Sequence, residues 1–261
     1  MAASTPSPVR VGLFATCLMN VFRPRLGFAS AHLLEAAGCE VEVPAAQTCC
    51  GQPGYNSGDF DAARALARQF IATFEPYDYV VAPSASCIAT VRHDYPQLLA
   101  DDPAWQSRAV ALAERSYELL SFLHDVRGYR PETKPFQATA TYHDGCSGLR
   151  ALGIKGQPRQ LLDKVPGLQF KEMADTEVCC GFGGTFCVKY PEISTKLVDD
   201  KIRNALDTNA DILTGGELGC LMHIAGRLRR IHAPVRVYHA AEILAGMADD
   251  DGIAGDEAYK E

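Results

Sequence analysis

The chain has 261 residues, with 25 lysines and arginines against 32 aspartates and glutamates and a formal net charge of −7. This acidic balance argues against binding to nucleic-acid phosphates or to an anionic membrane surface. Apolar residues make up 47% of the chain, and no apolar run approaches the roughly 20 residues needed to span a bilayer. The N-terminal sequence MAASTPSPVR lacks the apolar core of a signal peptide, so we expect a cytoplasmic protein.

The first part of the chain alternates between β-prone runs and helical spacing. The predicted elements are, in order, a strand over 9–17, a helix over 27–38, a strand over 39–44, a helix over 59–74 with Asp59 as its N-cap, a strand over 77–87, a helix from 87 to about 99, a surface helix or loop around 101–105, and a β-prone stretch over 116–123. A proline-rich, charged linker, RGYRPETKP, follows.

The second part repeats this order. It predicts a strand over 136–146, a helix over 158–167, a strand over 168–173, a helix over 191–206, a strand over 210–220, a helix from 221 to about 231, and a β-prone stretch over 235–244. We therefore predict an α/β protein with two tandem pseudo-repeated Rossmann-like β-α-β-α-β halves and parallel sheets, over 9–130 and 131–246. Residues 247–261 are acidic and aperiodic, which predicts a disordered tail.

Ten cysteines need an explanation, because a reducing cytoplasm does not favour disulfides. Eight of them form two sets: Cys17, Cys49, Cys50 and Cys87, and Cys146, Cys179, Cys180 and Cys220. Each set has an adjacent pair followed by glycine and flanked by one cysteine on either side. Matching members are 129 (17 to 146), 130 (49 to 179) and 133 (87 to 220) residues apart, so the sets are an internal repeat. All eight are predicted at the carboxyl ends of parallel strands, where ligands gather.

Four thiolates in each half suit a soft metal centre, either an iron–sulfur cluster or a tetrahedral zinc ion. An adjacent pair can serve one centre only if the backbone turns sharply, which Gly51 and Gly181 permit. Zinc ribbons use two local C-x2-4-C hooks, whereas here only the adjacent pair is local. A cluster is larger than one ion and accepts ligands from farther apart, so the spacing favours a cluster, with zinc as the less favoured occupant.

The alternative is that these cysteines are buried apolar residues. That interpretation suits Cys39, which lies outside the repeat, and Cys187 is open between a buried thiol and a redox-active neighbour. His143 lies near a predicted ligand and suits either a supporting role or an ordinary loop position, and His223 suits a packed helix face equally well. Spacing indicates no Ser-His-Asp or paired-carboxylate machinery, which favours an electron carrier.

The segments QTCCGQPGYNSGD, VVAPSASC, TYHDGC, EVCCGFGGTFCVK and GCLMHIAGRL together resemble the cysteine-rich CCG family, and within it the LutA (YkgE) family of lactate-utilisation iron–sulfur subunits. The resemblance runs from about Val11 to Leu244. More distant similarity extends to the CCG-containing subunit of heterodisulfide reductase and to the glycolate oxidase iron–sulfur subunit. The heterodisulfide reductase protein has five cysteines in each box. In this chain Ser84 and Glu217 stand where each box of that protein has its additional cysteine. An ordinary [4Fe-4S] cluster needs only four thiolates.

The resemblance implies one or two clusters, [4Fe-4S] in type, held by the two four-cysteine sets. It also implies LutB-like and LutC-like protein partners and a part in oxidising L-lactate to pyruvate, without a complete active site in this chain. Two rival hypotheses stay open at this point. One is a thiol or disulfide reductase subunit in which an extra thiol such as Cys187 acts directly, and the other is a zinc-bound assembly scaffold.

Overall fold

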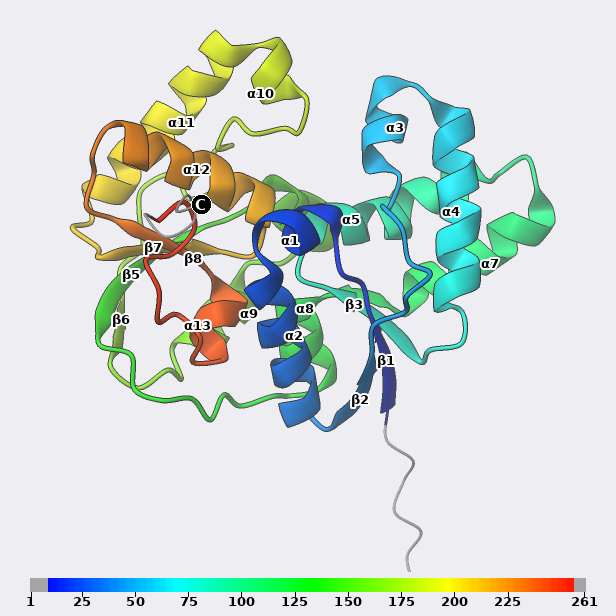
Figure 1. Ribbon diagram of the computed structural model, residues 1–261, viewed down its shortest axis with the longest axis horizontal. Coiled ribbons are helices and arrows are strands. Elements are labelled where there is room, and N and C mark those ends of the chain that lie inside the picture. The colour runs from blue at the N-terminus through cyan, green and yellow to red at the C-terminus, as the bar shows by residue number, and fades with distance from the viewer. Residues whose placement is uncertain (1–8, 256–261) are drawn as a thin grey trace, which may run out of the picture.

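The computed structural model describes residues 9–255, which form two four-stranded parallel sheets with helices between the strands (Figure 1). The first half contains β1 (Val9–Leu13), α1 (Cys17–Phe22), α2 (Pro24–Ala36), β2 (Cys39–Glu42), α3 (Gln52–Ser57), α4 (Phe60–Phe74), β3 (Tyr79–Ala82), α5 (Ala85–Ala89), η1 (Thr90–Asp94), α6 (Tyr95–Leu98), α7 (Pro103–Glu114), β4 (Ser116–Glu118), α8 (Leu119–Ser121) and η2 (Phe122–Val126).

The second half repeats this arrangement with fewer helices. It contains β5 (Ala138–His143), η3 (Ser147–Ala151), α9 (Gly156–Leu162), β6 (Leu168–Phe170), α10 (Phe186–Lys189), α11 (Pro191–Leu206), β7 (Ile212–Gly215), α12 (Leu218–Arg230), β8 (Arg236–His239) and α13 (Ala240–Leu244). The strand orders are β2-β1-β3-β4 and β6-β5-β7-β8, so the predicted α/β fold of two similar halves is confirmed. The boundary near residue 130 remains a prediction.

The central strands are buried because helices cover both faces of each sheet. In β1, Val11 lies opposite both Val41 and Tyr79, and the last three residues of the strand are buried. Helix α4 presents Ala63, Ala67, Phe70, Ile71 and Phe74 to the core, at the spacing of one helical face. Asp59 accepts a hydrogen bond from the Ala62 amide and caps this helix, as its sequence predicted.

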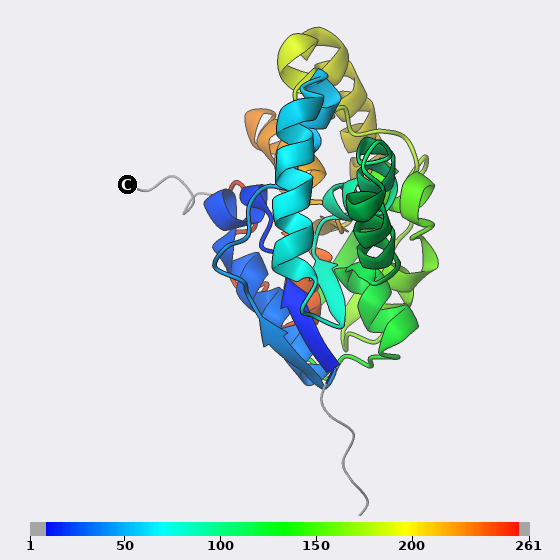
Figure 2. The ribbon, with the colours of Figure 1, turned by 90° about the vertical axis from the view of Figure 1, so that its right-hand side faces the viewer.

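Residues 103–114 form a full helix, α7, where we expected a surface helix or loop around 101–105, and its Ala109 and Leu112 belong to the same apolar cluster as Phe70 of α4. Figure 2 shows α7 beside α4, and the two helices are in contact. Asp102 caps α7 by accepting from the Trp105 amide, and Pro103 takes the first helical position. Within residues 9–255, no helix is both long and apolar enough to cross a bilayer.

The two halves pack against each other through α2 on α13 and α8 on α9 (Figure 1). One apolar cluster runs through both halves and includes Leu33 of α2 and Ile243 of α13. Arg23, at the start of α2, donates to the buried carboxylate of Glu242 at 2.8 Å. The carboxyl ends of both sheets are therefore held in a fixed relation to each other.

Two sequence expectations need correction. Strands β3 and β7 end at Ala82 and Gly215, before the cysteines that they were expected to reach. Pro83 has no amide hydrogen to continue the β3 ladder, and Ser84 then caps a helix by accepting from the Cys87 amide. Cys87 and Cys220 consequently lie in the first turns of α5 and α12 rather than at strand ends.

The second correction concerns residues 247–255, which were expected to be disordered. Asp250 pairs with Arg23 and Arg25, and Ile253 is buried against β8, where its amide donates to the Val237 carbonyl. The acidic residues are held by two arginines more than 200 positions earlier, so local sequence does not reveal the contact. Residues 256–261 of the predicted tail lie outside the described part of the chain.

Candidate metal centre

The first four-cysteine set converges at the carboxyl edge of the first sheet. Cys17 begins α1, Cys49 and Cys50 lie in the loop after β2, and Cys87 lies in α5. The Cys17 and Cys50 side chains both hydrogen-bond with Cys49, and Cys50 also hydrogen-bonds with Cys87. All four thiols predicted from spacing are therefore neighbours, even though 70 residues (17 to 87) separate the first from the last.

The second set has the same connectivity. The Cys146 and Cys180 side chains hydrogen-bond with Cys179, and Cys180 also hydrogen-bonds with Cys220. Cys180 and Cys220 are buried, as are their counterparts Cys50 and Cys87. Their common surroundings indicate that the internal repeat preserves a site as well as a fold.

A left-handed glycine turns the backbone after each adjacent pair. Gly51 has φ of 81° and Gly181 has φ of 85°, a conformation that disfavours any residue with a side chain. The Gly181 amide donates to the Cys179 sulfur at 3.3 Å, and the Gly51 amide likewise hydrogen-bonds with Cys49. The turn that we inferred from the glycines thus brings both adjacent thiols to one side and adds an amide donor.

Electrostatics favour a thiolate at the first cysteine of each adjacent pair. Hydrogen bonds from Cys17 and then Cys50 hold the pKa of Cys49 well below its usual range. Cys146 and Cys180 act in the same way on the pKa of Cys179. The donating thiols have raised pKa values in turn, because losing their protons would place several negative charges side by side. A cation bound among the sulfurs removes that repulsion.

His143 is a further buried group at the second set, for which the sequence left two roles open. The side chain is 1% exposed, and neither ring nitrogen has an oxygen or nitrogen partner among residues 9–255. One ring nitrogen and the sulfurs of Cys180 and Cys220 all lie within 4.8 Å of one another. The pKa of Cys220 is lowered to about 5, first by a hydrogen bond from Cys180 and then by His143. An unpartnered buried imidazole beside two thiols fits a metal centre.

Both sets open onto one cavity of about 400 Å³. The cysteines that line it are Cys17, Cys49, Cys50, Cys87, Cys146 and Cys220. Polar walls come from Gln52 and Asn56 of α3, and apolar walls from Leu18 and Phe182. The sequence did not predict this shared opening, because it depends on how the halves pack. Cys187 does not line the cavity, and its thiol contacts the Gly184 carbonyl at 3.1 Å.

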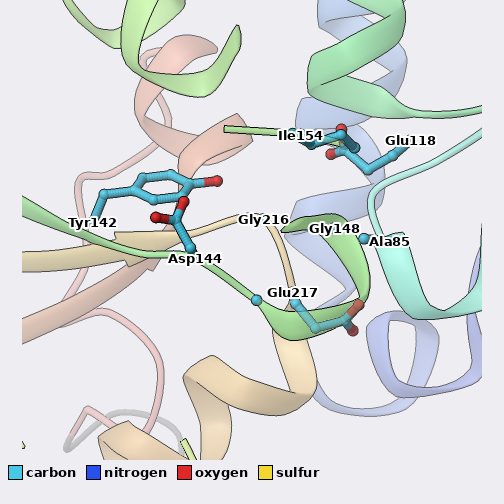
Figure 3. Close-up of a pocket in the computed structure, with 9 residues that line it drawn as sticks. Ala85, Glu118, Tyr142, Asp144, Gly148, Ile154, Gly216 and Glu217 are labelled. Atoms are coloured by element: carbon cyan, nitrogen blue, oxygen red, sulfur yellow. The ribbon is translucent and has the colours of Figure 1, made fainter. Parts of the chain in front are cut away.

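Glu217 lies between the two sets and was not predicted as a site residue. Its carboxylate accepts from the Ser86 amide at 2.8 Å and from the Ser84 hydroxyl at 3.2 Å, so it joins α5 of the first half to the start of α12. On its other side lies a small cavity that Glu118 also lines (Figure 3). Burial raises the pKa of both carboxyl groups to about 7. The only sequence signal for Glu217 was its place at the repeat position of Ser84.

This donor chemistry fits a metal ion or an iron–sulfur cluster. Each set offers four soft sulfur ligands, a backbone turn after the adjacent pair, and an amide donor beside that pair. Cys39, by contrast, is a buried residue of β2 within the apolar core, as we expected. The assignment of the eight cysteines as ligands remains a prediction that rests on their convergence.

Comparison with known proteins agrees with this chemistry. The model of the CCG cysteine-rich domain matches residues 11–92 and again 140–225. Lactate utilization protein A of Halalkalibacterium halodurans is 48% identical over 236 residues, which cover 90% of this chain and 96% of that protein. Lactate utilization protein A of Bacillus cytotoxicus is 45% identical, covering 90% of this chain and 98% of that protein.

Among solved structures, a hypothetical protein from Helicobacter pylori has a similar fold. It superposes with a TM-score of 0.65 at 11% sequence identity, covering 93% of this chain and 50% of that protein. The chain therefore spans about half the length of that structural relative. At this identity the similarity concerns the fold alone.

Proposed function

Because the chain belongs to the family of CCG cysteine-rich domain proteins and has a role in lactate utilisation, we propose that it is the iron–sulfur electron-transfer subunit of a cytoplasmic system oxidising L-lactate to pyruvate. In this proposal each four-cysteine set holds one [4Fe-4S] cluster. Cys17, Cys49, Cys50 and Cys87 hold the first, and Cys146, Cys179, Cys180 and Cys220 hold the second. When bound, the clusters supply one-electron chemistry.

The observation that carries the proposal is the single cavity shared by thiols of both sets. Clusters held by these two sets would border the same cavity of about 400 Å³, which is the basis for proposing that they exchange electrons within the chain. The protein residues around them hold the sulfurs in place and limit their contact with water. Cys50, Cys87 and Cys220 are buried, while Cys17 is exposed and gives an external partner access to the first set.

The same cavity is poorly suited to binding a hydroxy acid. None of the described residues that line it is an arginine, lysine or histidine, and the carboxyl group of Glu217 faces it. A substrate carboxylate is usually held by a cation, most often by the paired donors of an arginine. We therefore assign lactate binding to a partner subunit, and LutB-like and LutC-like proteins are the partners that we propose.

A reconstituted complex tests this assignment. Under anaerobic conditions, adding L-lactate to this chain with its partner subunits should reduce the clusters and produce pyruvate, while D-lactate serves as the control. Omitting the partners should abolish reduction. The electron-transfer proposal fails if L-lactate leaves the clusters oxidised in the complete complex.

The two rivals predict different results in the same preparation. If the chain is a disulfide reductase, an added disulfide takes two electrons from chemically reduced clusters and, with two protons, becomes two thiols. That activity depends on Cys187 if this thiol acts directly. A zinc scaffold contains zinc without acid-labile sulfide and shows no reducible chromophore. We favour neither, because Cys187 does not line the cavity and because thiols of both sets open onto that one cavity, as electron transfer between two centres requires.

A further inference from the structure

The two halves differ in the residue at the end of the first strand of each half, next to the cysteine set. His143 is three residues before Cys146, and Phe14 is three residues before Cys17, so the two side chains occupy equivalent places at the ends of β5 and β1. Phe14 is fully buried with the Cys50 and Cys87 thiols in one apolar cluster. The first half therefore has a hydrocarbon ring where the second half has an imidazole.

A second difference lies on the helix that supports each left-handed glycine. A side chain at Gly51 would meet Ala63 and Leu66 of α4, and one at Gly181 would meet Ser194 and Leu197 of α11. Both pairs are separated by 131 residues (63 to 194, 66 to 197), which fixes the correspondence between the helices. The same offset relates positions 70 and 201.

Position 70 is a phenylalanine and position 201 is a lysine, and both side chains are fully buried. Phe70 packs edge-on against Phe14, with ring centroids 4.9 Å apart. Lys201 donates from Nζ to the Thr176 carbonyl at 3.1 Å and also to the Asp175 carbonyl, in the loop that leads to Cys179. An aromatic pair in the first half is thus replaced by an imidazole and an ammonium group in the second.

Both replacements place hydrogen-bond donors or positive charge near the second set, and both should raise its reduction potential. Lys201 Nζ is held by the Asp175 and Thr176 carbonyls in the loop that leads to Cys179, so the buried ammonium lies near the second set. Burial lowers the pKa of Lys201, and the coulombic influence of Cys180 opposes that shift. The His143 ring can donate to the sulfurs of Cys180 or Cys220, whereas Phe14 has no donor. Hydrogen bonds to cluster sulfurs and nearby positive charge both raise a reduction potential.

Negative groups nearby do not cancel this difference. Arg159 holds the buried carboxylate of Asp144 through two hydrogen bonds of 2.9 Å. The same guanidinium also pairs with Glu172, whose side chain is 48% exposed, so the remaining negative charge lies where water screens it. Glu217 bonds to Ser84 and Ser86 of the first half and precedes Cys220 of the second, so it acts on both sets. The exposure of Cys17 raises the reduction potential of the first set, because water stabilises the added negative charge. This effect concerns one ligand of four, and high-dielectric water acts more weakly than a fixed buried charge.

We propose that the two cysteine sets hold clusters of unequal potential, with His143 and Lys201 making the second cluster the preferred site of the electron. Electrons then enter at the first set, where Cys17 is exposed, and come to rest at the second. His143 and Lys201 are positioning residues in this proposal, because they act on the cluster through its cysteine sulfurs. This inference rests on the proposed function, since it requires a cluster in each half.

The test compares the two clusters separately in the full-length chain. Cys179→Ala leaves only the first set complete, and Cys49→Ala leaves only the second. In anaerobic redox titrations followed by electron paramagnetic resonance, the variant with the second set should have the higher midpoint potential. We expect at least a tenfold preference in equilibrium constant, which is about 59 mV for a one-electron couple. Equal midpoints, or a higher midpoint for the first cluster, would overturn the inference.

Two further variants identify the cause. Lys201→Gln keeps a donor for the loop carbonyls and removes the charge, and His143→Phe installs the residue of the first half. Each should lower the midpoint of the second cluster and leave the first unchanged. Lys196→Gln is the matched control, because Lys196 is an exposed lysine on the same helix. A second midpoint that both variants leave unchanged would contradict the assigned cause.

Iron and sulfide analysis separates this inference from the proposed function. Two clusters with equal potentials would overturn the inference alone, whereas a preparation without sulfide would overturn both. If Lys201→Gln does not fold, the comparison of the two single-set variants still decides the order of potentials.

Discussion

Ser84 and Glu217 occupy equivalent places, each three residues before the last cysteine of its set, and they pair with each other across the junction of the halves. Their backbones form an antiparallel bridge, and the Ser84 hydroxyl donates to the Glu217 carboxylate at 3.2 Å. The Ser86 amide donates to the same carboxylate at 2.8 Å. The helices that carry Cys87 and Cys220 are therefore anchored to one buried group.

Removing this anchor should affect both sets at once. Glu217→Ala leaves the Ser86 amide and the Ser84 hydroxyl without their acceptor, which costs about 2 kcal/mol of unfolding free energy. Glu217→Gln keeps an acceptor oxygen and should cost less. Urea unfolding and iron content measure the two effects, and iron lost from only one half of the Ala variant would show that the pair does not link the sites.

The two left-handed glycines should differ in their tolerance of alanine. Both positions incur about 1–2 kcal/mol for a side chain at positive φ. A Cβ at Gly181 would also lie 2.6 Å from the Ser194 carbonyl oxygen, whereas at Gly51 the nearest atom is 3.5 Å away. Gly181→Ala should therefore lose a further 1–3 kcal/mol or so from overpacking, together with metal from the second half. Equal thermal stability of the two variants would contradict this account.

The buried carboxyl group of Glu118 should make stability depend on pH. Burial raises its pKa from 4.5 to about 7, so the folded state holds a proton that the unfolded chain releases. The stability that this proton contributes is complete below about pH 4.5 and is lost as the pH rises through about 7. Relative to wild type, Glu118→Gln should gain of the order of 3 kcal/mol between about pH 5 and pH 8.

Urea titrations of the metal-free, reduced protein at these two pH values measure the Glu118 effect. Glutamine is the suitable replacement because its side-chain oxygen can still accept from the Ser121 amide, as Glu118 does at 2.9 Å. A constant difference between the variant and wild type at both pH values would exclude the raised pKa.

The two cysteines outside the repeat should be dispensable for metal binding. Cys187→Ser leaves both four-thiol sets complete, and Cys39→Ala removes a buried thiol of β2. We expect wild-type iron content in both, with Cys39→Ala losing about 1 kcal/mol of stability from the lost apolar contacts. Loss of turnover in Cys187→Ser at unchanged iron content would instead support the disulfide reductase hypothesis.

The sequence predicted the two similar halves and several of their helices. The period of the cysteines predicted two similar halves, and the helical spacing of residues 191–206 matches α11 in both bounds. Asp59 was identified as a cap because its side chain acts on the helix it precedes. These features depend on local hydrogen bonding and on alternation of apolar residues, and both leave a periodic signal.

The missing parts depend on contacts between distant segments. Nothing in the sequence around Glu217 indicates that its carboxylate accepts from Ser86 of the other half. The shared cavity is lined by residues of both halves, such as Cys87 and Cys220, so it too depends on how the halves pack. Lys201 looks like an ordinary helix residue until its burial is known. The ends of β3 and β7 were misplaced because the β-prone runs continue into residues that the structure uses as helix starts.

The most direct test of the central claim is metal and sulfide analysis of protein purified without oxygen, for wild type and Cys179→Ala. An iron–sulfur subunit with two [4Fe-4S] centres contains about four iron and four sulfide for each cluster. Wild type should contain two clusters, and the variant should keep the iron of the first half alone. Zinc without sulfide, or no metal in either protein, would contradict the electron-transfer account.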